Sequence, residues 1–171
     1  TGIKIITNPT KTSYYVGDNI NLDGLSVQAT YNNGITASVE DYDVESSGAM
    51  STAGRKTISV SYLYNDIIKT TSFNITVEKP QIEMSKASFT MKKGDTSTVT
   101  ATTIPTSQNV SWKSSDTSVA TVSGGKITAV GSGATTISAS FIYNGISYAS
   151  ETTVTVSEDP VTLESIAVNT S

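Results

Sequence analysis

The chain has 171 residues, a net charge of −4 and only 15% charged residues, and it contains neither histidine nor cysteine. The absence of both residues excludes Ser-His-Asp and Cys-His nucleophile systems and removes the usual ligands of zinc, haem and iron–sulfur clusters. The low charge and the single arginine, Arg55, argue against a nucleic-acid partner, which needs a basic surface stripe. We therefore expect no catalytic residue, no metal ligand, no cofactor and no enzymatic activity.

Apolar and polar residues alternate in the first half of the chain, at 25–31, 57–62 and 73–77. A period of two with one apolar face is the pattern of half-buried β-strands. Turn residues separate these segments: Asn33-Gly34 is a strong hairpin signal, and Tyr64-Asn65-Asp66 links the second and third segments.

Four acidic residues lie between the first two of these segments, namely Glu40, Asp41, Asp43 and Glu45. Oxygen-rich loops can bind calcium, but this spacing lacks the calcium-loop pattern and its glycine. We expect a solvated acidic face here, with a calcium site as the alternative.

The second half alternates in the same way at 119–122, 126–130 and 152–156. Tight turns are expected at 123–126 and 143–145, and no segment shows a helical stripe. About seven short strands per 80 residues favour an all-β fold of immunoglobulin-like sandwiches. Five glycines occupy positions where a turn would use a positive φ: Gly17, Gly34, Gly94, Gly125 and Gly131.

An internal repeat divides the chain. Segment 54–62 resembles segment 133–141, which lies 79 residues later, and Tyr64-Asn65-Asp66-Ile67 resembles Tyr143-Asn144-Gly145-Ile146 at the same offset. We predict tandem domains at 1–79 and 80–159, followed by the start of a third module or a tail at 160–171.

Both halves resemble known bacterial domains. Segments 110–122 and 125–137 closely resemble the bacterial immunoglobulin-like domain of group 2, found in intimin- and invasin-like adhesins. The first half, with its motifs at 8–11, 24–27 and 52–54, is similar to the bacterial immunoglobulin-like domain of group 3. These resemblances identify the chain as two tandem immunoglobulin-like β-sandwich domains.

The resemblance indicates the location and role of the protein more than the ligand that it binds. It points to a non-catalytic structural, spacer or adhesion-type module of a secreted or cell-surface protein, in the cell wall of a Gram-positive bacterium. The alternative is a carbohydrate-binding or host-ligand-binding accessory module of a secreted enzyme or a phage virion protein. A host or cell-wall glycan or protein is the expected partner, and we expect a monomer.

No stretch approaches the ~20 apolar residues of a membrane helix. We expect no membrane insertion by these residues, and any export signal or anchor to lie outside them.

A few side chains have two interpretations each. Trp112 is either a sugar-stacking platform or a core residue, and its motif favours the core. An exposed tyrosine strip could bind glycans, with Tyr64 and Tyr143 as the candidate ligand-binding residues, although tyrosine is also a common strand residue. The full strip would comprise Tyr62, Tyr64, Tyr143 and Tyr148.

Lysine crosslinks are a further possibility, because some surface domains join lysine to asparagine or aspartate through an isopeptide bond. Lys11 and Lys56 are candidates. Ordinary surface lysines are the favoured explanation for both, and we expect no crosslink.

Overall fold

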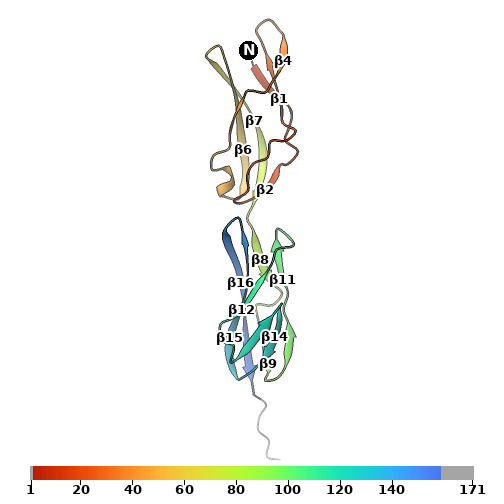
Figure 1. Cartoon of the computed structure of the whole chain (residues 1–171), viewed down its shortest axis with the longest axis vertical. Coiled ribbons are helices and arrows are strands. Elements are labelled where there is room, and N and C mark those ends of the chain that lie inside the picture. Colours follow the sequence, from red (N-terminus) through yellow and green to blue (C-terminus); the bar gives the residue numbers. More distant parts are fainter. Residues whose placement is uncertain (1, 159–171) are drawn as a thin grey trace, which may run out of the picture. The chain divides into compact units, whose positions relative to one another are not determined.

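The computed structural model describes residues 2–158, and the chain divides into two compact units, Thr1–Pro80 (unit 1) and Gln81–Ser171 (unit 2). Each unit is an immunoglobulin-like β-sandwich (Figure 1). Residues 160–171, for which a third module or a tail is predicted, lie outside the described residues. Within residues 2–158, no helix has the length and apolar character needed to cross a membrane.

Unit 1 consists of a three-stranded sheet in the order β1-β3-β4 and a four-stranded sheet in the order β2-β7-β6-β5. All neighbouring strands are antiparallel except β2 and β7, which are parallel. The elements are β1 (Gly2–Thr7), β2 (Ser13–Tyr15), β3 (Ser26–Thr30), β4 (Thr36–Val39), β5 (Asp43–Glu45), a 3₁₀ turn (Ala49–Ser51), β6 (Gly54–Tyr64) and β7 (Ile67–Glu78).

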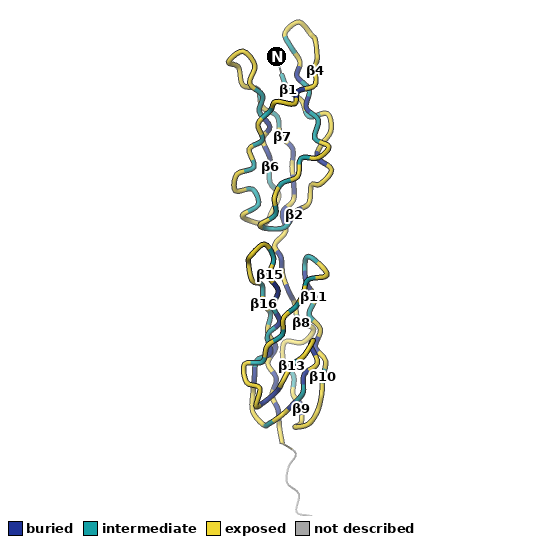
Figure 2. Tube along the Cα trace, viewed as in Figure 1, coloured by how far each residue is buried: buried dark blue, intermediate teal, exposed yellow. Residues whose placement is uncertain are grey.

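The core of unit 1 forms because each sheet turns its apolar face toward the other. Buried and exposed residues alternate along β6 and β7, as the sequence predicts (Figure 2). Tyr14 is buried within this core, and its hydroxyl accepts a hydrogen bond from the Asn21 N–H at 3.0 Å, so its polar end is satisfied. The buried core residues are Tyr14, Val27, Ile58, Val60, Phe73, Ile75 and Val77.

Unit 2 has a four-stranded sheet in the order β12-β15-β16-β9, a three-stranded sheet β10-β14-β13 and a pair β11-β8. Strand β9 pairs in parallel with β16, and the other pairs are antiparallel. The strands are β8 (Gln81–Met84), β9 (Ser88–Lys92), β10 (Thr96–Thr98), β11 (Ala101–Ile104), β12 (Ser111–Ser114), β13 (Ala120–Ser123), β14 (Lys126–Ala129), β15 (Gly133–Tyr143) and β16 (Ile146–Ser157).

The core of unit 2 has two clusters along the length of the sandwich. The larger comprises Met91, Val99, Val119, Ala120, Ile127, Ala129, Ile137, Val154 and Val156. The smaller comprises Ile82, Ala139 and Phe141. Met84 and Trp112 pack against both clusters, so these two half-buried side chains join them into one apolar interior.

The turns adopt the backbone conformations that their residues favour. The predicted hairpin at Asn33-Gly34 is present, because the Gly34 N–H donates to the Tyr31 carbonyl at 3.0 Å and Gly34 has a φ of 81°. Asn65 and Asp66 both have positive φ, at 49° and 62°, which is the conformation that a two-residue hairpin turn requires.

The prediction of positive φ holds for Gly17, Gly34, Gly94 and Gly125, but it is wrong for Gly131. At Gly131 the requirement is steric, because a Cβ atom there would lie 2.7 Å from the Ser118 carbonyl oxygen. A close approach of two backbone segments, and not a left-handed turn, explains this glycine.

Gly125 combines both constraints, so we expect it to tolerate no side chain. Its φ is 83°, and a Cβ would overlap the Val99 carbonyl oxygen and lie 3.2 Å from the Trp112 ring. We expect Gly125→Ala to destabilise unit 2 by roughly 2 to 3 kcal/mol, because the backbone must shift to relieve the overlap. Urea denaturation followed by tryptophan fluorescence measures this loss.

Gly124→Ala is the matched control. Gly124 also has a positive φ, 56°, but a Cβ atom added there would meet nothing within 4 Å. We expect a loss of about 1 to 2 kcal/mol, from the left-handed conformation alone. Equal losses for the two variants would show that the contact with Val99 has no energetic importance.

Candidate functional site

The predicted tyrosine strip is divided between the two units. Tyr62 and Tyr64 lie near the end of β6 in unit 1, and Tyr143 and Tyr148 lie in the β15–β16 hairpin of unit 2. Tyr64 is 41% exposed, whereas Tyr143 and Tyr148 are half-buried and pack against the smaller core cluster of unit 2. Tyr148 also stacks on Phe141, with ring centroids 5.4 Å apart.

Tyr64 belongs to an aromatic group at the end of unit 1. Tyr31, which follows β3, meets Tyr64 edge-to-face with ring centroids 5.0 Å apart and an interplanar angle of 64°. Tyr62 lies on the same face of β6 as Tyr64 and stacks on it, with centroids 6.3 Å apart and an angle of 25°. The group therefore joins a turn of one sheet to the hairpin of the other.

A hollow of about 270 Å³ opens beside these rings. It is lined by Tyr31, Asn32, Asn33, Tyr64, Asn65 and Ile67. Sequence reasoning singled out Tyr64 but missed Tyr31 and the three asparagines. The shared Tyr-Asn step at 31–32 and 64–65, each at the start of a turn, is the signal that would have pointed to them.

The electrostatic environment of this group is mildly acidic. The pKa of Tyr62 is raised above its ordinary value, first by hydrogen bonding with Tyr31 and then by desolvation. Electrostatic repulsion from Tyr31, Tyr64 and Asp41 acts in the same direction. The raised pKa keeps Tyr62 neutral at physiological pH, so this side chain is not poised to act as a base.

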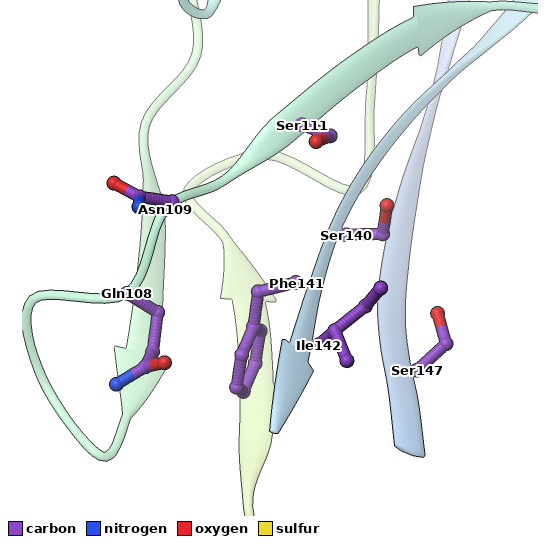
Figure 3. Close-up of a pocket in the computed structure, with 7 residues that line it drawn as sticks. All are labelled: Gln108, Asn109, Ser111, Ser140, Phe141, Ile142 and Ser147. Carbon is purple, nitrogen blue, oxygen red and sulfur yellow. The ribbon is translucent and has the colours of Figure 1, made fainter. Parts of the chain in front are cut away.

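Unit 2 has a hollow of about 320 Å³ on the outer face of its four-stranded sheet (Figure 3). Figure 3 shows Gln108 and Asn109 on the loop before β12, with Ile142 and Ser147 on the neighbouring strands β15 and β16. Ile142 is 71% exposed, but the only ring at this hollow, that of Phe141, is 2% exposed. Amides and hydroxyls are therefore present without an accessible aromatic surface.

Trp112 is packed as a core residue. It is half-buried, contacts both core clusters of unit 2, and its ring covers Gly125. The neighbouring loop is closed by Asp116, whose Oδ1 accepts hydrogen bonds from the Ser118 hydroxyl at 2.6 Å and the Ser118 N–H at 2.9 Å. These bonds, with the hydroxyl first in importance, lower the pKa of Asp116.

The acidic residues 40–45 do not converge. Asp43 lies in β5 opposite Ser61, and the Glu45 carboxylate accepts a hydrogen bond from the Ser47 N–H at 2.7 Å. Among residues 2–158, no group of three or more acidic side chains is arranged to hold a metal ion. The calcium alternative has no support from this arrangement.

The two candidate crosslinking lysines make polar contacts with neighbouring side chains. Lys11 forms an ion pair with Asp18 at 3.3 Å and lies 4.5 Å from the centroid of the Tyr14 ring. Lys56 donates a hydrogen bond to the Thr52 hydroxyl at 2.6 Å. These contacts account for both side chains, and the absence of a crosslink stays a prediction.

Comparison with family models identifies both halves of the chain. The model of the bacterial Ig-like domain (group 3) matches residues 7–77, and that of the bacterial Ig-like domain (group 2) matches residues 79–140. Both resemblances predicted from the sequence are confirmed. No curated protein matches the chain.

Several solved structures are similar to the chain. Domains 4 and 5 of the S-layer protein SbsC share 19% identity over 91% of this chain and 98% of that chain, with a TM-score of 0.41. A structure of domains 1–6 of SbsC matches with a TM-score of 0.42 and 20% identity; the match covers 94% of this chain but only 28% of that longer one.

An intimin fragment, crystallised with the intimin-binding domain of its translocated receptor, shares 14% identity over 91% of this chain and 64% of that chain, with a TM-score of 0.38. Mouse protocadherin-24 EC1-3 shares 12% identity over 88% of this chain and 62% of that chain, with a TM-score of 0.40.

The two interpretations of Trp112 predict different results for Trp112→Ala. If Trp112 joins the two core clusters, the variant loses about 3 to 5 kcal/mol of the stability of unit 2. Thermal and urea denaturation followed by circular dichroism measure this loss. Ile142→Ala, at an exposed apolar residue of the same unit, is the control and should change stability by about 0.5 kcal/mol or less. A fully stable Trp112→Ala protein would contradict the core interpretation.

The lowered pKa of Asp116 predicts acid sensitivity of unit 2. Because the folded pKa lies below the unfolded one, the unfolded chain binds more protons as the pH falls, and stability is lost. The contribution is complete above the ordinary aspartate pKa of about 3.9 and disappears as the pH falls through the lower folded value.

Urea denaturation between pH 2.5 and 6, on the wild type and Asp116→Asn, tests this expectation. The amide does not titrate, so the variant should lose less stability than the wild type over the acid range. Identical slopes for both proteins would show that Asp116 is not involved.

Proposed function

We propose that this chain, which belongs to the bacterial Ig-like domains with a group 3 domain followed by a group 2 domain, is a structural, adhesion-type module of an extracellular bacterial surface protein. Its main role is to space other parts of that protein from the cell wall of a Gram-positive bacterium. It is non-catalytic and monomeric, and it binds no nucleic acid.

The observation that carries this proposal is the polar outer face of the four-stranded sheet in each unit. In unit 1, Ser59 pairs with Ser72 and Ser61 with Thr70 across β6 and β7. The adjacent Thr57 and Asn74 are joined by a side-chain hydrogen bond of 3.0 Å. These small neutral groups keep most of this sheet face hydrated, and its apolar surface is limited to the exposed pair Leu63 and Ile68 at the hairpin end.

The same arrangement recurs in unit 2. Thr136 pairs with Thr153 and Ser138 with Glu151 on the outer face of β15 and β16. Each core cluster draws its residues from one unit, so each sandwich has an interior of its own. Modules built in this way can be placed in series without redesign of their surfaces, which suits a spacer.

The proposal that the chain is non-catalytic has chemical support. The chain contains no histidine or cysteine, and the aspartate with a lowered pKa, Asp116, is already engaged in closing a loop. The hollows described above hold no pair of carboxylates, which a hydrolase of glycosides would need.

Replacement in the parent protein tests the spacer role. We expect an unrelated tandem of two Ig-like domains, put in place of this chain, to preserve surface display and adhesion of the bacterium. Deletion of the chain should reduce adhesion while display is retained. Antibody labelling of intact cells measures display, and adherence to host cells or matrix measures function.

Two results would contradict the proposal. If antibodies against the chain label only permeabilised cells, the chain is not a surface module. If the replaced protein is displayed normally but adheres no better than the deletion, the chain contributes a specific contact and is more than a spacer.

A further inference from the structure

The end of unit 1 differs from the polar sheet faces that favour a spacer. Two turns, 31–35 between β3 and β4 and 64–67 between β6 and β7, lie side by side there, as the contact of Tyr31 with Tyr64 shows. They enclose the hollow of about 270 Å³ described above. Binding residues in sandwich proteins are commonly carried on such turns, because the sheets hold them in place.

The aromatic wall of the hollow is held in position before any ligand arrives. Tyr64 is supported by Tyr31 at its edge and by Tyr62 in a stacked arrangement, yet it remains 41% exposed. Ile67 pairs directly with Tyr64 across the hairpin and is 52% exposed. A tyrosine fixed in this way offers a large contact area at little entropic cost on binding.

Three asparagines supply the polar groups of the hollow. The Asn33 side-chain oxygen accepts a hydrogen bond from the Ile35 N–H at 3.1 Å, which leaves its NH₂ group available as a donor. Within residues 2–158, the side-chain amides of Asn32 and Asn65 have no hydrogen-bond partner. Each amide offers donors and an acceptor side by side. This arrangement is complementary to two adjacent hydroxyl groups of a ligand, because each hydroxyl both donates and accepts a hydrogen bond.

The charge of the site restricts the ligand further. No lysine, arginine, aspartate or glutamate lines the hollow. The nearby Asp41 acts electrostatically on Tyr62, and the chain carries a net charge of −4. An acidic ligand would meet repulsion with no cation to offset it, so the site suits an uncharged one.

We propose that this hollow binds a neutral saccharide, with the apolar face of one sugar ring against Tyr64 and its hydroxyls bonded to Asn32, Asn33 and Asn65. A peptide fits the site less well, because the hollow is lined by turn residues and the ends of β6 and β7, and no edge strand contributes a residue to it for backbone pairing. The site also lacks a charged group to hold a peptide terminus. This binding role goes beyond spacing, and its failure would leave the spacer proposal intact.

Unit 2 provides an internal control within the same chain. Its hairpin carries the matching sequence Tyr143-Asn144-Gly145-Ile146, but Tyr143 is half-buried against the core cluster of Ile82 and Phe141. The hollow of unit 2 lacks an exposed ring (Figure 3). The same residue types are thus present in both units, whereas an exposed ring beside three amides is found at the end of unit 1.

The test begins with the 171-residue chain on a printed panel of neutral and acidic oligosaccharides. The solution probes are cellobiose, lactose, maltose and N,N′-diacetylchitobiose, with sialyllactose as the acidic comparison. Titration followed by ¹H–¹⁵N NMR measures the affinity and identifies the amides that shift. We expect at least one neutral sugar to bind, with shifts at 31–35 and 64–67, and sialyllactose to bind at least about tenfold more weakly.

Three variants assign the binding to this hollow. Tyr64→Ala should weaken binding by about tenfold or more, the scale expected for a lost ring contact. Tyr64→Phe keeps the ring and should retain most of the affinity. Tyr143→Ala, the matched change in unit 2, should leave the affinity unchanged. Circular dichroism and thermal melting verify that each variant is folded.

Three outcomes would overturn the proposal. The first is that no neutral sugar binds the wild-type chain at millimolar concentration. The second is that a sugar binds but Tyr64→Ala, folded, binds it as tightly as the wild type. The third is that shifts at 31–35 and 64–67 arise with a random peptide library and not with sugars.

Discussion

Each sheet of this protein has one apolar face, and only the facing sheet of the same unit can cover it. The sequence meets this constraint with small side chains: the interior of unit 2 includes Ala120, Ala129 and Ala139, each at most 3% exposed. Trp112 is the large residue that joins its two clusters. Because the interiors are thin, the distance between the two sheets of a unit depends strongly on the turns and on the close approaches of backbone segments.

Much of the fold was predictable from periodicity and turn chemistry. The alternation at 57–62 and 73–77 reflects the long hairpin of β6 and β7, in which Ile58 and Val60 are fully buried. Short strands were harder to predict from the sequence. Strand β2 has three residues, Ser13–Tyr15, and its parallel pairing with β7 joins residues more than 60 positions apart in the chain. Three residues are too few to show a period.

The candidate site could be predicted only in part, for a similar reason. Tyr64 stands out in the sequence because it opens a turn after an alternating strand. Its contact with Tyr31 joins turns of different sheets, and no local pattern indicates which turns share an end of a sandwich. The equivalent Tyr143 looked equally promising in the sequence, and only the packing of unit 2 shows that its ring is half-buried.

The parallel strand pairs have a mechanical consequence. In both units a strand near the start of the unit lies parallel to the last strand, with three paired residues between β2 and β7 and five between β9 and β16. Tension applied at the two ends of a unit slides such strands past each other, so their hydrogen bonds must break together and not one at a time. Unit 2 should therefore withstand the greater pulling force, and unit 1 would yield first and limit the load transmitted along the chain.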